Sequence, residues 1–348
     1  MSPPRRKRRL PARLAVVGLL VAGLVHPPAC LAEPAVARNS AISIEVRART
    51  IDTFNASEPE LRRFGRVEFR GGLELASSFK EFGGLSAVKM EADGQRFVAL
   101  TDKANWFTGR IVYEGIRPVA IADAVMAPML AANGRLLAAR GWYDTESLAA
   151  DRGAFYVGIE RVNRIVKFYF GRYGVQARAR PIATPAGVRS LPYNRGVEGL
   201  AFVPKGLHLS GTLIAFSERG LDRAGNIRAF LIGGPTPGGF AVRRTDSFDI
   251  SDCALLPSGD LLLLERRFSW VSGVAMRLRR IALSSIVPGA LVDGPILLFA
   301  DLGYQIDNME ALGVHQTAQG ETVLTLLSDD NFSAVQRTLL LQFTLLGE

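Results

Sequence analysis

The chain has 348 residues, 48% of them hydrophobic, and a formal net charge of +9 at pH 7 from 42 basic and 33 acidic residues. Six of the basic residues and none of the acidic ones precede Glu33, so the remainder holds 36 basic and 33 acidic residues, a net charge near +3. That balance gives little support to nucleic-acid binding, and we expect no nucleic-acid partner. The length suits one large all-β or α/β domain, or two smaller domains.

The first 32 residues have the pattern of a secretory signal peptide. A basic stretch ending at Arg13 precedes an apolar core from Leu14 to Val25, and small residues up to Ala32 suit cleavage before Glu33. A retained anchor is the weaker alternative, because this core is shorter than the roughly 20 apolar residues that span a bilayer. We expect a periplasmic or secreted protein with no membrane span after cleavage. Cleavage would also remove one of the two cysteines, which excludes an intrachain disulfide.

Residues 33–41 are small and polar, and we predict a flexible lead before a single domain at 42–348. Residues 42–51 alternate apolar and polar side chains, which is typical of a half-buried strand. Residues 66–75 show the same alternation. Beyond them, no helical periodicity is sustained over 15 residues.

A related phrase then recurs five times, between residue 83 and the end of the chain. Each copy has a polar leading residue before a small-apolar pair, and these leading positions recur after 60, 52, 54 and 58 residues. The leading residues are Ser86, Glu146, Glu198, Asp252 and Glu310. Each copy continues through a turn and a short apolar run to a trailing acid. The trailing acids are Asp102, Glu160, Glu218, Glu265 and Asp329.

Repeats of fifty to sixty residues indicate a supersecondary unit repeated about an axis. The apolar runs suit strands buried on both faces, and an alternating strand follows each of them. Four strands with their loops match the blade of a β-propeller. Five copies plus the N-terminal strands predict an all-β fold of six blades, in which the strand at 42–51 closes the last blade. A parallel β-helix is disfavoured because its repeats are much shorter. We expect a monomer.

These phrases resemble the phytase-like family, secreted β-propellers described as having esterase-like activity. The resemblance spans roughly residues 65 to 343. It is carried by GGLS at 83–86, DTES at 144–147, GIER at 158–161, GVEGLAF at 196–202, SER at 217–219, LPSGDLLLLERR at 256–267, DNMEALG at 307–313 and LLSDDNF at 326–332. One departure is Ala311, where the family pattern has Gly. The resemblance implies a hydrolase of phosphate or carboxylate esters.

If the leading and trailing residues converge on one face of the propeller, their carboxylates cannot all stay ionised without cations or bound protons. Oxygen ligands without nearby His or Cys favour Ca²⁺. The final copy has a surplus of such groups, so we predict metal ligands mainly there. They are Asp307, Asn308, Glu310, Asp329, Asp330 and Asn331, joined by Glu218. The predicted catalytic carboxylates are Glu146, Glu198 and Glu310. The alternative is a structural role, in which these acids accept hydrogen bonds from neighbouring blades.

Three cations follow trailing acids and are predicted to bind a phosphate or ester substrate: Lys103, Arg219 and Arg266. No Gly-x-Ser-x-Gly elbow occurs in the sequence, which argues against a serine hydrolase. The leading hypothesis is a metal-assisted hydrolase of phosphate or other esters. A calcium-dependent lactonase and a non-catalytic periplasmic propeller that binds a small molecule or a protein remain the alternatives.

Overall fold

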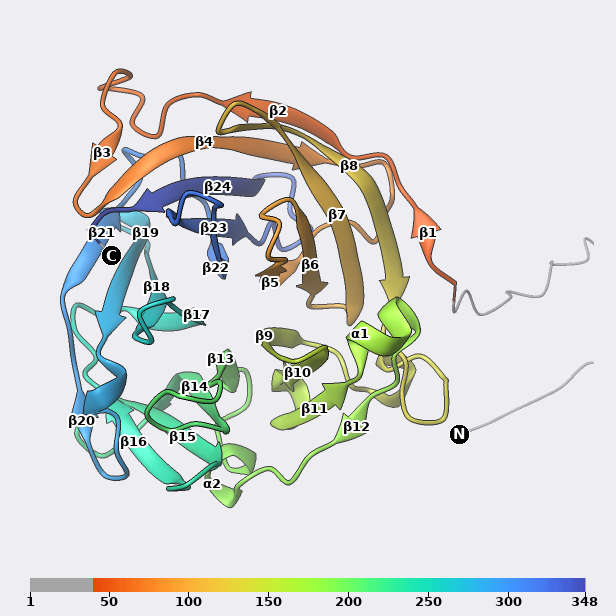
Figure 1. Ribbon diagram of the computed structural model, residues 1–348, viewed down its shortest axis with the longest axis vertical. Coiled ribbons are helices and arrows are strands. Elements are labelled where there is room, and N and C mark those ends of the chain that lie inside the picture. Colours follow the sequence, from red (N-terminus) through yellow and green to blue (C-terminus); the bar gives the residue numbers. More distant parts are fainter. Residues whose placement is uncertain (1–39, 348) are drawn as a thin grey trace, which may run out of the picture. The chain divides into compact units, whose positions relative to one another are not determined.

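The computed structural model describes residues 40–347, so the predicted signal peptide lies outside the described residues. Five β-sheets are arranged around a common axis as the blades of a propeller (Figure 1). The innermost strand of each sheet contacts the innermost strand of the next, in the order β5, β9, β13, β17, β22 and back to β5. The described part of the chain is therefore a closed ring of blades.

The first two blades use residues 85–181 together with the N-terminal strand β1. From the axis outwards, the first blade consists of β5 (Leu85–Met90), β6 (Arg96–Thr101), β7 (Asn105–Glu114), β8 (Arg117–Pro128) and β1 (Ile42–Ser43). The second consists of β9 (Thr145–Asp151), β10 (Ala154–Ile159), β11 (Arg164–Phe168) and β12 (Arg180–Pro181). Two single-turn helices, α1 (Phe170–Tyr173) and α2 (Ala186–Arg189), lie in the chain around β12.

The other three blades follow in sequence order. The third consists of β13 (Val197–Phe202), β14 (Thr212–Leu221), β15 (Ile227–Gly233), β16 (Gly238–Val242) and β20 (Leu291–Val292). The fourth consists of β17 (Asp249–Leu255), β18 (Leu261–Ser269), β19 (Gly273–Ile281) and β21 (Ile296–Ala300). The fifth consists of β22 (Met309–Gln316), β23 (Thr322–Ser328), β24 (Thr338–Leu345), β4 (Val67–Ala76) and β2 (Arg47–Ile51), with the short β3 (Arg63–Phe64) paired to β4.

The prediction of six blades is wrong, because the N-terminal strands do not make a blade of their own. Strand β4 pairs with the C-terminal β24 along most of its length, and β2 lies outside β4 in the same sheet. The predicted strand at 42–51 is split: its first part joins the first blade as β1, and its second part is β2. Each of the five repeats is thus one blade, and strands β2, β3 and β4 share the fifth blade with the C-terminal strands.

Apolar side chains on both faces of the strands join neighbouring blades. Five clusters of buried apolar side chains occupy the five junctions between blades. At the fourth junction, for example, Leu262 and Leu264 of β18 pack with Leu324 and Leu326 of β23. Burial on both faces explains why the second strand of each blade is a continuous apolar run. No helix within residues 40–347 is long and apolar enough to cross a membrane.

A buried ion cluster replaces apolar packing at one place in the fourth blade. Glu265 has no exposed surface, and its side chain lies between those of Arg277 and Arg279 of the neighbouring β19. The Arg277 Nε to Glu265 Oε2 distance is 2.7 Å. Both arginine side chains are almost fully buried, and Glu265 is the anion that they share; Arg277 also contacts Asp246, and Arg279 contacts Asp293.

Glu265→Gln is expected to lower the free energy of unfolding by about 3–5 kcal/mol, because it leaves two buried cations without their shared anion. Chemical denaturation monitored by fluorescence measures this loss. Glu91→Gln is the matched control, since Glu91 and its partner Arg96 are both well exposed and such pairs contribute about 1 kcal/mol or less. Equal effects of the two substitutions would contradict a buried structural role for Glu265.

Candidate functional site

Each innermost strand carries a β-bulge near its first residue. In the pairing of the first two strands of each blade, one residue of the inner strand is skipped at this point. The skipped residues are Ser86, Glu146, Glu198, Ser251 and Glu310. Four of these are predicted leading residues, and all occupy the same structural position at one end of the inner strands.

The second strand of each blade ends beside this bulge. Backbone pairing places the same position opposite the residue two before the bulge residue in every blade: Asp102 lies opposite Gly84, Glu160 opposite Asp144, and Glu218 opposite Gly196. In the two remaining blades, Arg266 lies opposite Asp249 and Asp329 opposite Asn308. The ten positions, two from each blade, therefore surround the same mouth of the propeller axis.

Two residues assigned to this pattern from the sequence are off by one. In the fourth blade Ser251 occupies the bulge, whereas Asp252 is the residue after it. Asp252 accepts hydrogen bonds from the amides of Cys253 and Leu312, both at 2.7 Å, and so links the fourth blade to the fifth. The trailing position of this blade belongs to Arg266, because Glu265 faces β19 instead.

Seven carboxylates and one guanidinium remain at the mouth, and we call this set the acid ring. Its members are Asp102, Glu146, Glu160, Glu198, Glu218, Arg266, Glu310 and Asp329. Glu146, Glu160, Glu198, Glu310 and Asp329 are at most 8% exposed. One oxygen from each of Glu160, Glu198 and Glu218 lies within 4.8 Å of the other two. The predicted catalytic residues Glu146, Glu198 and Glu310 all belong to this ring.

Burial and mutual repulsion raise the pKa values of six ring carboxyls, those of Asp102, Glu146, Glu160, Glu198, Glu218 and Asp329. Desolvation is the larger cause throughout. It raises the pKa of Asp102 to about 6, that of Glu218 to about 6 and that of Asp329 to about 8. The neighbouring carboxylates add to this effect at Asp329, where Glu310 is the main one. The pKa values of the fully enclosed Glu146 and Glu198 are raised well above their usual range.

Arg266 neutralises one side of the ring. Its Nη2 lies 3.1 Å from Glu310 Oε1 and 3.4 Å from Glu218 Oε1, and its Nη1 donates to Asn308 Oδ1 at 2.8 Å. The surrounding carboxylates raise the pKa of Arg266, although burial opposes this. Asn308 also donates to Glu310 at 2.6 Å. Glu310 is therefore paired with a cation, whereas neither Glu146 nor Glu198 forms an ion pair within residues 40–347.

On the other side of the ring, the backbone of Gly196 lies close to Glu160 and holds its carboxylate in place. The amide of Gly196 donates to Glu160 Oε1 at 2.7 Å, which lowers the pKa of Glu160 against the effect of burial. A Cβ added at Gly196 would lie 2.6 Å from Glu160 Cγ, so a side chain there would displace the carboxylate. The side chains of Glu160 and Glu198 are also hydrogen-bonded to each other.

The other predicted metal ligands of the final copy make contacts with the chain itself. Asp330 accepts from the amides of Gly84 and Phe332 and from the Thr338 hydroxyl, at 2.9–3.1 Å. Asn331 donates to the Gln336 side chain on the surface. Asp307 accepts from the amides of Asn308 and Arg337. Of the seven predicted ligands, Glu218, Glu310 and Asp329 lie in the acid ring, and Asn308 borders it.

The three predicted substrate-binding cations differ in their surroundings. Arg266 lies within the ring. The Arg219 side chain is paired with Asp249, whose Oδ2 is 2.7 Å from Arg219 Nε. Lys103 is exposed, and its Nζ lies 3.0 Å from the centre of the Phe332 ring. Lys103 directly follows Asp102, a ring member that the sequence placed among the repeat acids but not among the site residues.

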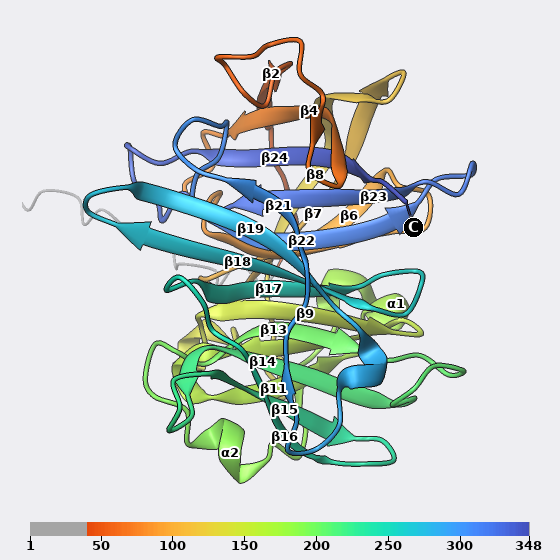
Figure 2. The same cartoon turned by 90° about the vertical axis from the view of Figure 1, so that its left-hand side faces the viewer.

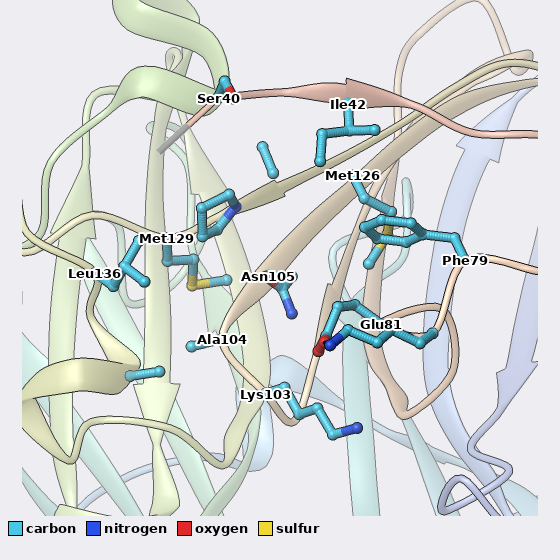
Figure 3. Close-up of a pocket in the computed structure, with 14 residues that line it drawn as sticks. Ser40, Ile42, Phe79, Glu81, Lys103, Ala104, Asn105, Met126, Met129 and Leu136 are labelled. Atoms are coloured by element: carbon cyan, nitrogen blue, oxygen red, sulfur yellow. The ribbon is translucent and has the colours of Figure 1, made fainter. Parts of the chain in front are cut away.

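An apolar cavity of about 640 Å³ opens beyond Lys103, on the outer part of the first blade. Figure 3 shows Ile42, Phe79, Met126, Met129 and Leu136 around it, with Lys103, Ala104 and Asn105 along one side. Because Lys103 is next to Asp102 in the chain, this cavity and the acid ring lie on the same end of the first blade.

Comparisons with known proteins identify the family. Solved structures similar to this chain include a protein of unknown function from Bacteroides caccae (12% identity, 69% of this chain and 67% of that one, TM-score 0.30). U3-55K is also similar (12% identity, 76% of this chain and 96% of that one, TM-score 0.38). So is the PQQ-bound aldose sugar dehydrogenase from Streptomyces coelicolor (12% identity, 88% of this chain and 99% of that one, TM-score 0.38). No match was found among curated proteins. The sequence pattern of the phytase-like family, described as "esterase-like activity of phytase", matches residues 80–332. Since this match covers more than half of the chain, the protein belongs to the phytase-like family.

Proposed function

We propose that the acid ring is the active site of a metal-dependent hydrolase of phosphate or other esters. The observation that carries the proposal is the trio Glu160, Glu198 and Glu218, whose oxygens lie within 4.8 Å of one another in a largely buried setting. Burying several carboxylates together is costly unless they bind protons or a cation. A purely structural role would be served at lower cost by serines, as at Ser86 and Ser251.

The ring fits a hard divalent cation. Its ligand atoms are all oxygens, with no His or Cys among the ring residues, and this favours Ca²⁺ over transition metals. Glu160, Glu198 and Glu218 would hold the ion, with Glu146 next to them. The ion would supply charge stabilisation to an ester or phosphate oxygen and would lower the pKa of bound water.

Asp102 is our choice for the general base. Its pKa of about 6 is close to neutral pH, where a general base is most effective, and it is more accessible than Glu146 or Glu198. Its Oδ1 has no hydrogen-bond partner within the described residues. Lys103 beside it would orient an anionic substrate group, and the apolar cavity would take an apolar ester substituent.

The first test is the metal content of the purified mature protein, followed by hydrolysis of phosphomonoesters, carboxylate esters and lactones with calcium and with a chelator. We expect a tightly bound divalent ion and turnover that the chelator abolishes. Turnover of lactones alone would favour a calcium-dependent lactonase. A protein that holds no metal and turns over none of these substrates would be a non-catalytic binding propeller, and the proposal would be wrong.

Two substitutions separate metal binding from base catalysis. Glu198→Gln is expected to weaken metal binding and activity together, by about 100-fold or more, because it removes one charged ligand. Asp102→Asn is expected to retain the metal but lose about 100-fold or more in kcat, the usual contribution of a general base. Glu91→Gln, on the surface of the first blade, is the control. Full activity of Asp102→Asn would exclude Asp102 as the base.

Export to the periplasm or the medium is part of the proposal, and so is a monomeric state. Calcium is available outside the cytoplasm at concentrations that suit sites of moderate affinity. Cell fractionation of the full-length protein, with N-terminal sequencing of the exported form, checks cleavage before Glu33.

A further inference from the structure

A polar cavity of about 900 Å³ lies at the junction between the fifth and first blades. It is formed by the β22–β23, β5–β6 and β7–β8 turns, at the opposite end of the inner strands from the acid ring. Figure 2 shows the fifth blade from the side, with β22, β23, β24 and β4 one above another. The cavity is therefore separate from the proposed active site.

Buried polar side chains line this cavity where apolar packing would be expected. On β24, Leu340 packs between the fifth and first blades, and Gln342 lies on the same face two residues later. Gln342 is fully buried and donates to Tyr113 Oη at 2.9 Å and to Thr325 Oγ1 at 3.0 Å. Arg70 of β4 is only 8% exposed. Buried polar groups lower the stability of the fold unless they are fully paired. Gln342 and Arg70 therefore do not serve stability here, which suggests another role for them.

Arg70 and Glu321 form an ion pair in which each side chain has an atom without a hydrogen-bond partner in the described part of the chain. Arg70 Nη1 lies 3.3 Å from Glu321 Oε2 and donates to Thr344 Oγ1 at 3.0 Å. Within residues 40–347, Arg70 Nη2 and Glu321 Oε1 make no hydrogen bond. Arg70 Nη2 is thus an unpaired cationic donor and Glu321 Oε1 an unpaired anionic acceptor among these residues. Both residues line the cavity.

We propose that this cavity binds a free α-amino acid. A carboxylate and an ammonium group on the same carbon match the adjacent Arg70 Nη2 and Glu321 Oε1, whereas ligands with a single charge satisfy only one of them. The rest of the wall includes Gln95, Gln316, Thr317 and Gln319, which suit a polar side chain, together with Asp93, Ile116 and Val323. His315, also in the wall, is held neutral because burial and the nearby Arg70 lower its pKa, so it adds no competing charge.

The test is a thermal-shift screen of the mature protein against each of the 20 L-amino acids, followed by calorimetry with those that raise Tm. We expect at least one polar amino acid to bind. For that amino acid, the analogue without the ammonium group and the amide without the carboxylate should each bind about tenfold or more weakly. If no amino acid binds, or if both analogues bind equally well, the proposal is wrong.

Substitutions locate the site. Arg70→Lys, which removes Nη2, and Glu321→Gln should each weaken binding by about tenfold or more. Ala318→Trp narrows the cavity from an exposed turn without touching the ion pair, so it remains informative if Arg70→Lys misfolds. Arg110→Lys, which makes the same change at an exposed ion pair of the first blade, is the control. Binding that survives both Arg70→Lys and Ala318→Trp would place the ligand elsewhere.

Discussion

Metal-free protein is expected to lose stability as the pH rises from 5 to 9, opposite to the behaviour of proteins whose carboxylates are paired. The pKa values of Asp102, Glu218 and Asp329 in the folded state are about 6, 6 and 8, above their unfolded values. Their contribution to stability is therefore present below the unfolded pKa values, near pH 4, and is lost as the pH rises through 6 to 8. One pKa unit corresponds to about 1.4 kcal/mol, so we expect a loss of a few kcal/mol and a fall in Tm on the order of 10 °C.

Scanning calorimetry in chelator, at pH 5, 7 and 9, measures this trend. Calcium at 100 times its Kd should restore about 2.7 kcal/mol at pH 9 and less at pH 5, where protons compete for the same oxygens. Asp329→Asn should flatten the pH profile, and Glu91→Gln should leave it unchanged. A Tm that is constant or rises between pH 5 and 9 would show that the ring carboxyls do not titrate in this range.

Arg266→Met is expected to have opposite effects on stability and on metal affinity. Without the guanidinium, Glu218 and Glu310 lose their common cation, so the metal-free protein should be about 3 kcal/mol less stable at pH 8. The same loss makes the ring more negative, so calcium should bind about tenfold more tightly. Denaturation with and without calcium, together with calorimetric titration, measures both quantities.

Arg267→Met is the matched control, since Arg267 directly follows Arg266 but donates to the Asp246 carbonyl outside the ring. It should change neither the calcium affinity nor the pH dependence of Tm. If Arg266→Met weakened calcium binding, Arg266 would act by positioning ligands rather than by neutralising charge.

The repeats in the sequence predicted the propeller correctly but not its blade count. Each blade has its own apolar run and its own polar leading residue, and both signals are local. Whether 42–51 and 66–75 form a separate blade depends on pairing with residues near 340. Their alternating pattern fits an outer strand in any blade, so it does not specify the partner.

The sequence repeats gave most of the positions around the mouth, and two local features explain the residues that they misplaced. A β-bulge adds a residue to each inner strand, and a bulge leaves no mark in the sequence that distinguishes Ser251 from Asp252. The same shift separates Glu265, which faces the buried arginines of β19, from Arg266 in the ring. Asp307 and Asp330 were predicted to be metal ligands, but their carboxylates accept hydrogen bonds from backbone amides. Which backbone amides point toward a side chain cannot be predicted from residue types.

The pairing of β4 with β24 also has a consequence for how the chain folds. The paired residues are 263 to 278 positions apart in the chain, and the fifth sheet cannot be completed until residues 338–345 are available. Until then the edge of β4 that pairs with β24 is exposed, and strands of other chains can pair with it. Folding should therefore be slow, with the pairing of β4 and β24 as the rate-limiting step. A chain truncated before Thr338 should aggregate rather than remain in solution as a four-bladed fragment.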